Sequence, residues 1–218
     1  HTDGPEGINK NGHGEAFDVD SQMRMSATFG AHLAGDPRLS VLFAPGSSNA
    51  AGEIIGMPNG RTSDDYVGAD GVTYAGIADR HIYAQTHPAL RKKDVPMVLL
   101  TTAEVHFLIG EAIIRGWVSG DAKTYYDAGV TAAMTMLADF YPDSTPIAQA
   151  DIDAFLAGPG AYDSSKGWEM LMNEYWKATF LNEYEAYANW RRTGYPTLSP
   201  TQHPNSVSGN QIMRRMIY

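Results

Sequence analysis

The residues best suited to binding chemistry lie in one stretch of the chain, between positions 59 and 83. Flat tyrosine rings can pack against the apolar C–H side of pyranose rings, while polar side chains bind hydroxyl groups at the ring edge. The stretch supplies three tyrosines and five polar partners: Tyr66, Tyr74 and Tyr83, with Asn59, Arg61, Asp64, Asp65 and Asp79. We therefore predict a ligand-binding site here. The alternative is that these tyrosines only anchor the loop to neighbouring helices.

Catalytic arrangements are not indicated. Glu104 and Glu111 stand seven positions apart, on one face of a predicted helix. A glycosidase needs two carboxylates on opposite sides of a cleft, which two residues of one helix face cannot provide. His106 and Glu111 do not reproduce the His-Glu-x-x-His zinc spacing, and the Gly-x-Ser-x-Gly and phosphate-loop patterns are absent. We predict that the chain is not an enzyme.

The sequence also bears on metals and cofactors. It contains no cysteine, which excludes disulfides, thiolate zinc sites and cysteine nucleophiles. Asp64, Asp65 and Asp70 near Gly71 could bind calcium, but the twelve-residue calcium loop pattern is missing. We predict no cofactor, with calcium as the one alternative.

Composition narrows the classes of partner. The 218 residues carry a formal net charge of −9, which disfavours binding to phosphate backbones, so nucleic acid is not a predicted partner. Hydrophobic residues make up 43%, as in globular proteins. The longest apolar run, around Val95 to Leu100, is too short to cross a bilayer.

The first part of the chain is predicted to be loop-rich. Residues 1–20 are polar and rich in glycine, and a helix is expected from Ser21 to Leu33. Between residues 44 and 96, glycine and proline recur and no 3.6-residue periodicity is present, although Val72-Thr73-Tyr74 could form a small strand. Because loops commonly present binding sites on a rigid scaffold, we interpret residues 1–97 as the variable, ligand-facing region.

The second part, residues 98–218, is predicted to be a helical core. Thr101 or Thr102 can cap a helix to about Trp117, and a second helix runs from about 121 to 140. Their short connection requires antiparallel packing, and their combined length approaches one tetratricopeptide unit. A short helix over 151–156 and a long one from Ser164 or Ser165 to about 192 follow. Aromatic residues at 176, 180, 184 and 187 are predicted to face the core. The fold class is therefore mainly α.

Five stretches, in order along the chain, resemble the SusD/RagB family. They are Asp36-Pro37-Arg38-Leu39, the run from Val95 to Ala112, Gly116-Trp117 with Tyr125-Tyr126, Asn189-Trp190-Arg191-Arg192-Thr193-Gly194-Tyr195-Pro196, and Met213-Arg214-Arg215-Met216-Ile217-Tyr218. Gly110 departs from the pattern, which usually has alanine there. The resemblance covers residues 36–218 and matches the carboxy-terminal portion of the family, so the family's amino-terminal helices are expected to be missing from this chain.

The resemblance implies a SusD-like helical fold with long loops. It also implies a cell-surface lipoprotein that binds oligosaccharide or another nutrient without catalysis, and that is held at the outer membrane by a lipid anchor absent from this chain. The implied partner is a TonB-dependent, SusC-like outer-membrane transporter. Two alternatives stay open: a helical protein–protein scaffold without a small ligand, and a variant that binds peptides or amino acids.

Overall fold

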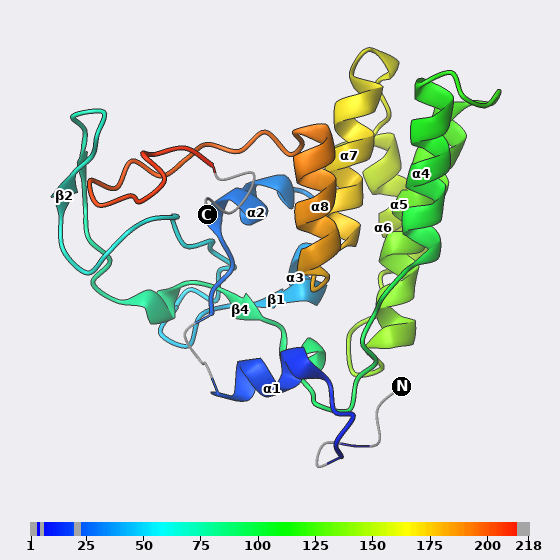
Figure 1. Cartoon of the computed structure of the whole chain (residues 1–218). Helices are drawn as coiled ribbons and strands as arrows, with labels where there is room; N and C mark the ends of the chain where they lie inside the picture. Colours follow the sequence, from blue (N-terminus) through cyan, green and yellow to red (C-terminus); the bar gives the residue numbers. More distant parts are fainter. Residues whose placement is uncertain (1–3, 5–6, 20–22, 213–218) are drawn as a thin grey trace.

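The computed structural model describes residue 4, residues 7–19 and residues 23–212. The chain is mainly α-helical, as predicted (Figure 1). The helices are α1 (Gly12–Val19), α2 (Ala27–His32), α3 (Leu39–Leu42), α4 (Thr102–Ile114), α5 (Ala122–Phe140), α6 (Gln149–Ala157), α7 (Gly167–Ala178) and α8 (Glu183–Thr193). The 3-10 turns are η1 (Arg80–Ile82), η2 (Pro88–Leu90) and η3 (Ser164–Lys166), and the strands are β1 (Phe43–Ala44), β2 (Tyr66–Val67), β3 (Thr73–Tyr74) and β4 (Gln85–Thr86).

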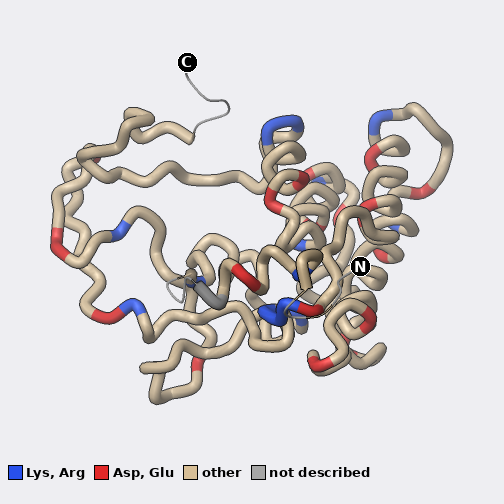
Figure 2. The backbone as a smooth tube through the Cα atoms, turned by 60° about the horizontal axis from the view of Figure 1, so that its bottom comes forward, with Lys and Arg blue, Asp and Glu red and all other residues tan. Residues whose placement is uncertain are grey.

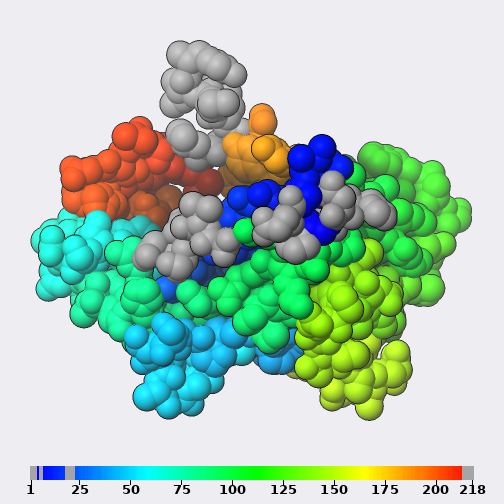
Figure 3. All heavy atoms as spheres, turned by 90° about the horizontal axis from the view of Figure 1, so that it is seen from below, coloured from blue at the N-terminus to red at the C-terminus, as the bar shows by residue number. Residues whose placement is uncertain are grey.

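Helices α4 to α8 stand together as a bundle, and an extended loop region projects from one side of it (Figure 1). In the loop region, β1 pairs with β4 and β2 pairs with β3, both antiparallel. The predicted strand at Val72-Thr73-Tyr74 is thus confirmed as β3. Two views show the segment after α8 lying against the hairpin of β2 and β3 (Figures 1 and 3). The loop region is therefore held by chain segments far apart in sequence.

Two glycines allow the helices of the bundle to approach closely. A Cβ atom added to Gly129 in α5 would lie 2.5 Å from the ring of Phe107 in α4. A Cβ atom on Gly110 would lie 2.5 Å from Cδ1 of Leu171 in α7. The glycine that departs from the family pattern therefore gives α7 room beside α4, which offsets its low helix propensity.

The long helix predicted from residue 164 to 192 is wrong, because the chain breaks between α7 and α8. The Thr179 hydroxyl donates to the Tyr175 carbonyl at 3.1 Å, and Leu181 adopts a left-handed φ of 67°. Asn182 then caps α8 by accepting a hydrogen bond from the Glu185 N–H at 3.5 Å. The break changes which side chains face inward, so Tyr184 and Tyr187 are exposed rather than part of the core.

The prediction of loop over residues 1–20 is also wrong, because α1 forms there. Asn11 caps it by accepting hydrogen bonds from the N–H groups of His13 at 2.8 Å and Gly14 at 3.2 Å. The Asn11 side-chain amide donates to the carbonyl oxygens of Val95 and Pro96, which ties α1 to the segment before α4. Ser21 lies outside the described residues, and α2 begins only after Ser26, whose hydroxyl accepts from the Phe29 N–H at 3.1 Å.

A buried ion cluster joins the segment before α3 to α7. Arg38 Nη2 lies 2.5 Å from Asp36 Oδ2 and 2.6 Å from Glu174 Oε2. Lys177 Nζ contacts the same two carboxylates, at 3.2 Å from Asp36. All four residues are buried. The charges of these four residues are thus paired inside the protein. Elsewhere along the backbone, basic and acidic residues are interspersed, and no region carries charges of only one sign (Figure 2).

Candidate functional site

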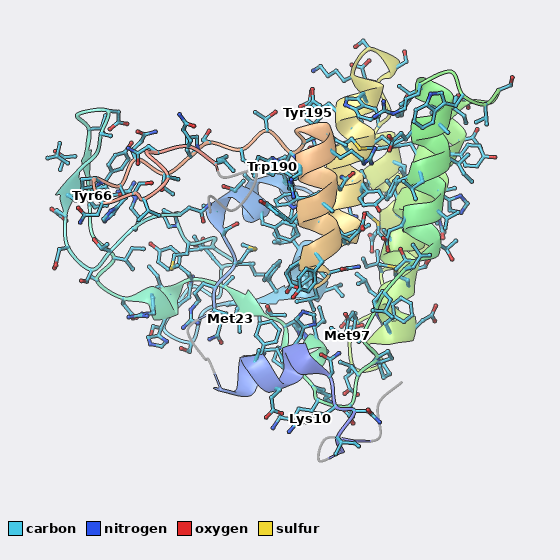
Figure 4. All side chains as sticks on the ribbon, viewed as in Figure 1. Lys10, Met23, Tyr66, Met97, Trp190 and Tyr195 are labelled. Atoms are coloured by element: carbon cyan, nitrogen blue, oxygen red, sulfur yellow. The ribbon has the colours of Figure 1, made fainter. Side chains whose placement is uncertain are left out.

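The strongest candidate site is built on the hairpin of β2 and β3. The register pairs Tyr66 with Tyr74, so both rings lie on the same face of the hairpin. Their centroids are 5.3 Å apart with an interplanar angle of 29°, which is a stacked arrangement. Both rings are half-buried. The hairpin thus presents a paired aromatic surface at the end of the loop region farthest from the bundle (Figure 4).

Two further side chains complete this aromatic cluster, which we define as Arg61, Tyr66, Tyr74 and His203. The Arg61 guanidinium lies 4.4 Å from the centroid of the Tyr74 ring, and the His203 ring lies 4.8 Å from that of Tyr66. Arg61 also donates to the Ala75 carbonyl at 3.2 Å. These contacts fix the rings, and both rings stay partly exposed beside the exposed carboxylates of Asp64, Asp65 and Asp70.

The tyrosine hydroxyls are used within the hairpin. Tyr66 donates to the Gly60 carbonyl at 3.0 Å, and Tyr74 donates to Asp70 Oδ2 at 2.6 Å. The hydrogen bond to Asp70 raises the pKa of Tyr74 and lowers the pKa of Asp70. These bonds support the alternative that the tyrosines anchor their loop, and they are compatible with ligand stacking because they engage the hydroxyls and leave both rings partly exposed.

The other predicted site residues are only partly brought together. Asp64 is exposed beside the hairpin, and Asp65 accepts a hydrogen bond from the Gly76 N–H at 2.7 Å. Asn59 instead donates to the Thr28 hydroxyl at 3.3 Å. Asp79 and Tyr83 lie at the two ends of η1, as its amino-terminal and carboxy-terminal caps, outside the hairpin. Arg61, Asp64, Asp65, Tyr66 and Tyr74 therefore form one locality, and the other three predicted residues lie apart from it.

His203 was missed at the level of the sequence. It comes from the segment after α8, where the Ala69 N–H donates to the Gln202 carbonyl at 3.0 Å and so docks that segment on the hairpin. Neither residue belongs to a recognisable local pattern, because the contact joins segments separated by most of the chain. Only long-range information could have placed His203 in the aromatic cluster.

A second concavity, a groove of about 400 Å³, lies between α1, α2 and the α7–α8 junction. Its lining is mostly apolar and aromatic, with few polar groups: Phe17, Met23, Met25, Phe29, Phe43, Trp176, Phe180 and Leu181, with Arg24, Thr86, Thr179 and Glu183. A sugar carries hydroxyl groups around its ring, and each loses free energy if it is buried without a hydrogen-bonding partner. The aromatic cluster therefore suits a glycan better than this groove does.

The two glutamates of α4 are engaged in structural contacts. Glu104 accepts from the Thr101 N–H at 2.9 Å and hydroxyl at 3.0 Å, and burial raises its pKa. Glu111 accepts from Arg115 at 2.7 Å and from Arg192. Burial alone would raise the pKa of Glu111, but hydrogen bonds from the two arginines outweigh it and lower that pKa. Neither carboxylate faces the other across a cleft, so the pair does not have a glycosidase arrangement.

The aspartates considered for calcium do not converge either. Asp70 binds the Tyr74 hydroxyl and Asp65 binds the Gly76 N–H. Within residues 7–19 and 23–212, no group of three or more His, Asp or Glu side chains is arranged to hold a metal ion. Among those same residues, no helix is both long and apolar enough to cross a bilayer.

Comparisons with known proteins identify the fold and the family. A family model for SusD-like proteins, described as starch-binding and associated with the outer membrane, matches residues 8–218. A solved chitin-binding protein is 30% identical with a TM-score of 0.78, and the match covers 94% of this chain and 45% of that one. A SusD homologue from Bacteroides fragilis NCTC 9343 is 26% identical with a TM-score of 0.64, over 84% of this chain and 43% of that one.

A SusD-like protein described as Bacteroidetes AC2a has the same fold at 23% identity, with a TM-score of 0.73 over 94% of this chain and 49% of its own. The chain thus spans about half the length of the solved structures it resembles. No curated protein matches it. The family model extends over nearly the whole sequence, and the fold agrees with it. The chain belongs to the SusD-like family, whose members are described as starch-binding and associated with the outer membrane.

Proposed function

We propose that this chain binds oligosaccharide at the cell surface and passes it, without chemical change, to a TonB-dependent, SusC-like transporter of the outer membrane. The observation that carries the proposal is the aromatic cluster, in which Tyr66 and Tyr74 stack at 5.3 Å on a hairpin held by the segment after α8. Both rings are partly exposed and exposed carboxylates lie beside them, so aromatic surface and hydroxyl partners occur together. In the full-length protein a lipid anchor would hold this scaffold at the membrane.

The class of cargo is supported by the family description and by one relative. The family is described as starch-binding, and the relative with 30% identity is a chitin-binding protein. Both ligands are polymers of pyranose rings, for which ring stacking supplies affinity whatever the linkage. We therefore propose a pyranose polymer or its fragments as cargo.

Retention on immobilised starch and immobilised chitin tests the proposal. We expect a variant with both Tyr66→Ala and Tyr74→Ala to lose at least about tenfold in affinity for the polysaccharide. Each stacking contact between an aromatic ring and a sugar ring is worth about 1 kcal/mol or more, and the variant loses two of them. The matched control is Tyr184→Ala, which removes an exposed tyrosine from α8, far along the chain from the hairpin. Unchanged retention in the double variant would contradict the proposal.

A second pair of substitutions separates stacking from anchoring. Tyr66→Phe with Tyr74→Phe keeps both rings and removes the hydroxyl bonds to Gly60 and Asp70. We expect this variant to keep most of its glycan affinity. If it instead loses retention as fully as the alanine pair, the tyrosines act by holding the hairpin rather than by contacting the sugar. Binding to peptides but to neither polysaccharide would favour the peptide-binding alternative.

A further inference from the structure

The dipeptide Asn-Gly occurs twice in the sequence, at Asn11-Gly12 and at Asn59-Gly60. In this pair of residues the backbone nitrogen of the glycine can attack the asparagine side chain, because glycine has no side chain to shield that nitrogen and its backbone is conformationally free. The attack requires the nitrogen to come close to the side-chain carbon Cγ, so its rate depends on how the local structure holds the two groups. The two pairs share one chemistry, and the fold decides which of them reacts.

Asn11 is held by hydrogen bonds at both ends of its side-chain amide. Its Oδ1 accepts from the N–H groups of His13 at 2.8 Å and Gly14 at 3.2 Å. Its Nδ2 donates to the carbonyl oxygens of Val95 at 3.1 Å and Pro96 at 3.2 Å. Asn11 is also only 5% exposed. Turning its Cγ toward the nitrogen of the next residue would break these bonds inside the protein, which costs free energy that water does not restore.

Asn59 and Gly60 lie instead in an exposed turn of the loop region. Asn59 Nδ2 donates to the Thr28 hydroxyl at 3.3 Å, which is longer than most hydrogen bonds of this type, and the bond itself is exposed to water. Within the described residues, the Gly60 N–H donates to no backbone carbonyl. The Asn59 amide can therefore turn toward the Gly60 nitrogen at little cost in free energy.

We propose that Asn59 is a site of spontaneous deamidation and that the fold protects Asn11 from the same reaction. The Gly60 nitrogen gives up its proton to water and forms a bond to Cγ of Asn59, while the bond from Cγ to Nδ2 breaks and Nδ2 leaves as ammonia. Water then opens the resulting succinimide ring at one of its two carbonyl carbons. Opening at Cγ gives aspartate, and opening at the main-chain carbonyl carbon gives isoaspartate. Nothing is oxidised or reduced, and water is the co-reactant.

The modification falls at the base of the aromatic cluster. The Gly60 carbonyl accepts from the Tyr66 hydroxyl at 3.0 Å. A Cβ atom added to Gly60 would lie 2.6 Å from the Thr201 side chain, so the segment after α8 packs directly on this glycine. Isoaspartate adds one carbon atom to the main chain between the Cα of residue 59 and the Gly60 nitrogen, and both products add a negative charge at neutral pH. Deamidation therefore alters the backbone where it contacts Tyr66 and Thr201.

Peptide mass spectrometry of the whole chain, aged in mildly alkaline buffer and then digested, tests the proposal. Trypsin cleaves after lysine and arginine, which places Asn11 in the peptide of residues 11–24 and Asn59 in the peptide of residues 39–61. Deamidation makes a peptide about one dalton heavier, because –OH replaces –NH2. One sample is aged in native buffer, and a second is aged in concentrated urea, which removes the influence of the fold.

In native buffer we expect Asn59 to convert at least about tenfold faster than Asn11, which reacts only when its hydrogen bonds open. In urea the two sites should convert at rates within about twofold of each other, since both are then unfolded Asn-Gly pairs. Asn59→Gln is the control, because peptide 39–61 also contains Asn49. A rate at Asn59 no higher than that at Asn11 in native buffer overturns the proposal, and so does a mass gain of peptide 39–61 that persists in Asn59→Gln.

Discussion

Glu104 shows how a single buried carboxylate serves the fold at one pH and opposes it at another. It completes the capping box of α4 by accepting from the Thr101 backbone N–H, yet it is only 2% exposed. Burial raises its pKa, and the nearby charge of Glu185 adds to the increase, while the hydrogen bonds from Thr101 partly offset it. The folded protein therefore holds this proton more tightly than the unfolded chain does.

The pH dependence of stability follows from this direction. Above the ordinary carboxyl pKa of 4.5, the unfolded chain has already released the proton, so the contribution of Glu104 to folding stability falls as the pH rises. Glu104→Gln removes the charge and keeps the cap, since glutamine also occupies this position of capping boxes. We expect urea denaturation to show the variant gaining stability relative to the parent chain between about pH 4 and about pH 7. The control, Glu53→Gln at an exposed loop position, should show no such trend.

The roles of buried carboxylates are difficult to predict from the sequence. Glu104 and Glu111 were recognised as a pair on one face, and the structure places both inward, toward α7 and α8. Arg115 is a local partner four residues after Glu111, but Arg192 and Tyr175 are brought close only by the packing of α7 and α8 on α4. His203 and Asn11 were missed for the same reason, because their partners lie far away along the chain.

At the scale of elements, the start of α4 depends on one of two adjacent threonines. Thr101 caps the helix, whereas Thr102 is its first helical residue and is exposed. We expect Thr101→Ala to lower the free energy of unfolding by about 1 kcal/mol, the usual cost of losing a side-chain cap. Thr102→Ala should change it by less than about 0.5 kcal/mol, as most exposed substitutions do. Equal losses in thermal or urea unfolding would show that the cap contributes nothing specific.

The close approach of α4 and α5 gives a second prediction at this scale. Gly129→Ala improves helix propensity by about 1 kcal/mol, but its Cβ would lie 2.5 Å from the fully buried ring of Phe107. Overpacking a core costs about 1–3 kcal/mol, so we expect a net loss of stability. Asp139→Ala, at an exposed position near the end of the same helix, is the control and should be neutral or stabilising. A Gly129→Ala variant as stable as the parent would show that Phe107 can move aside.

The elements were predictable where periodicity and turn signals act locally. The helix pair around residues 102–114 and 122–140 agrees with its prediction, because apolar spacing, a capping threonine and the Gly116–Gly120 turn all lie within one stretch. The break at residues 179–182 was missed, because the aromatic residues continue a helical spacing across it. Only the Asn182 cap and the left-handed Leu181 reveal the break.

At the scale of the whole molecule, the buried ion cluster connects the loop region to the bundle. Burial opposes ionisation of Asp36, but the charge and hydrogen bonds of Arg38 outweigh it and lower the pKa of Asp36. The stability from this carboxylate is therefore present above its unfolded pKa and lost as the pH falls through the folded pKa. The cluster should make the junction between the two regions sensitive to acid.

Removing one partner of the cluster tests this connection. Arg38→Met leaves two buried carboxylates, Asp36 and Glu174, with Lys177 as their remaining cation. We expect a loss of about 3–5 kcal/mol in the free energy of unfolding, measured with urea, because breaking a buried ion pair strands a charge. Arg191→Met removes an exposed arginine of α8 and should cost far less. A small loss from Arg38→Met would mean that the loop region is held by apolar packing alone.

The segment after α8 also affects the order in which parts of the molecule fold during synthesis. His203 closes on a hairpin formed by residues 66–74, so the aromatic cluster is complete only when position 203 is present. A polypeptide emerging amino end first can assemble α4 to α8 before that point, since those helices end at Thr193. A chain truncated just after α8 should therefore be a well-formed helical bundle without an intact cluster, and the capacity to hold a ligand would be acquired after the bundle has formed.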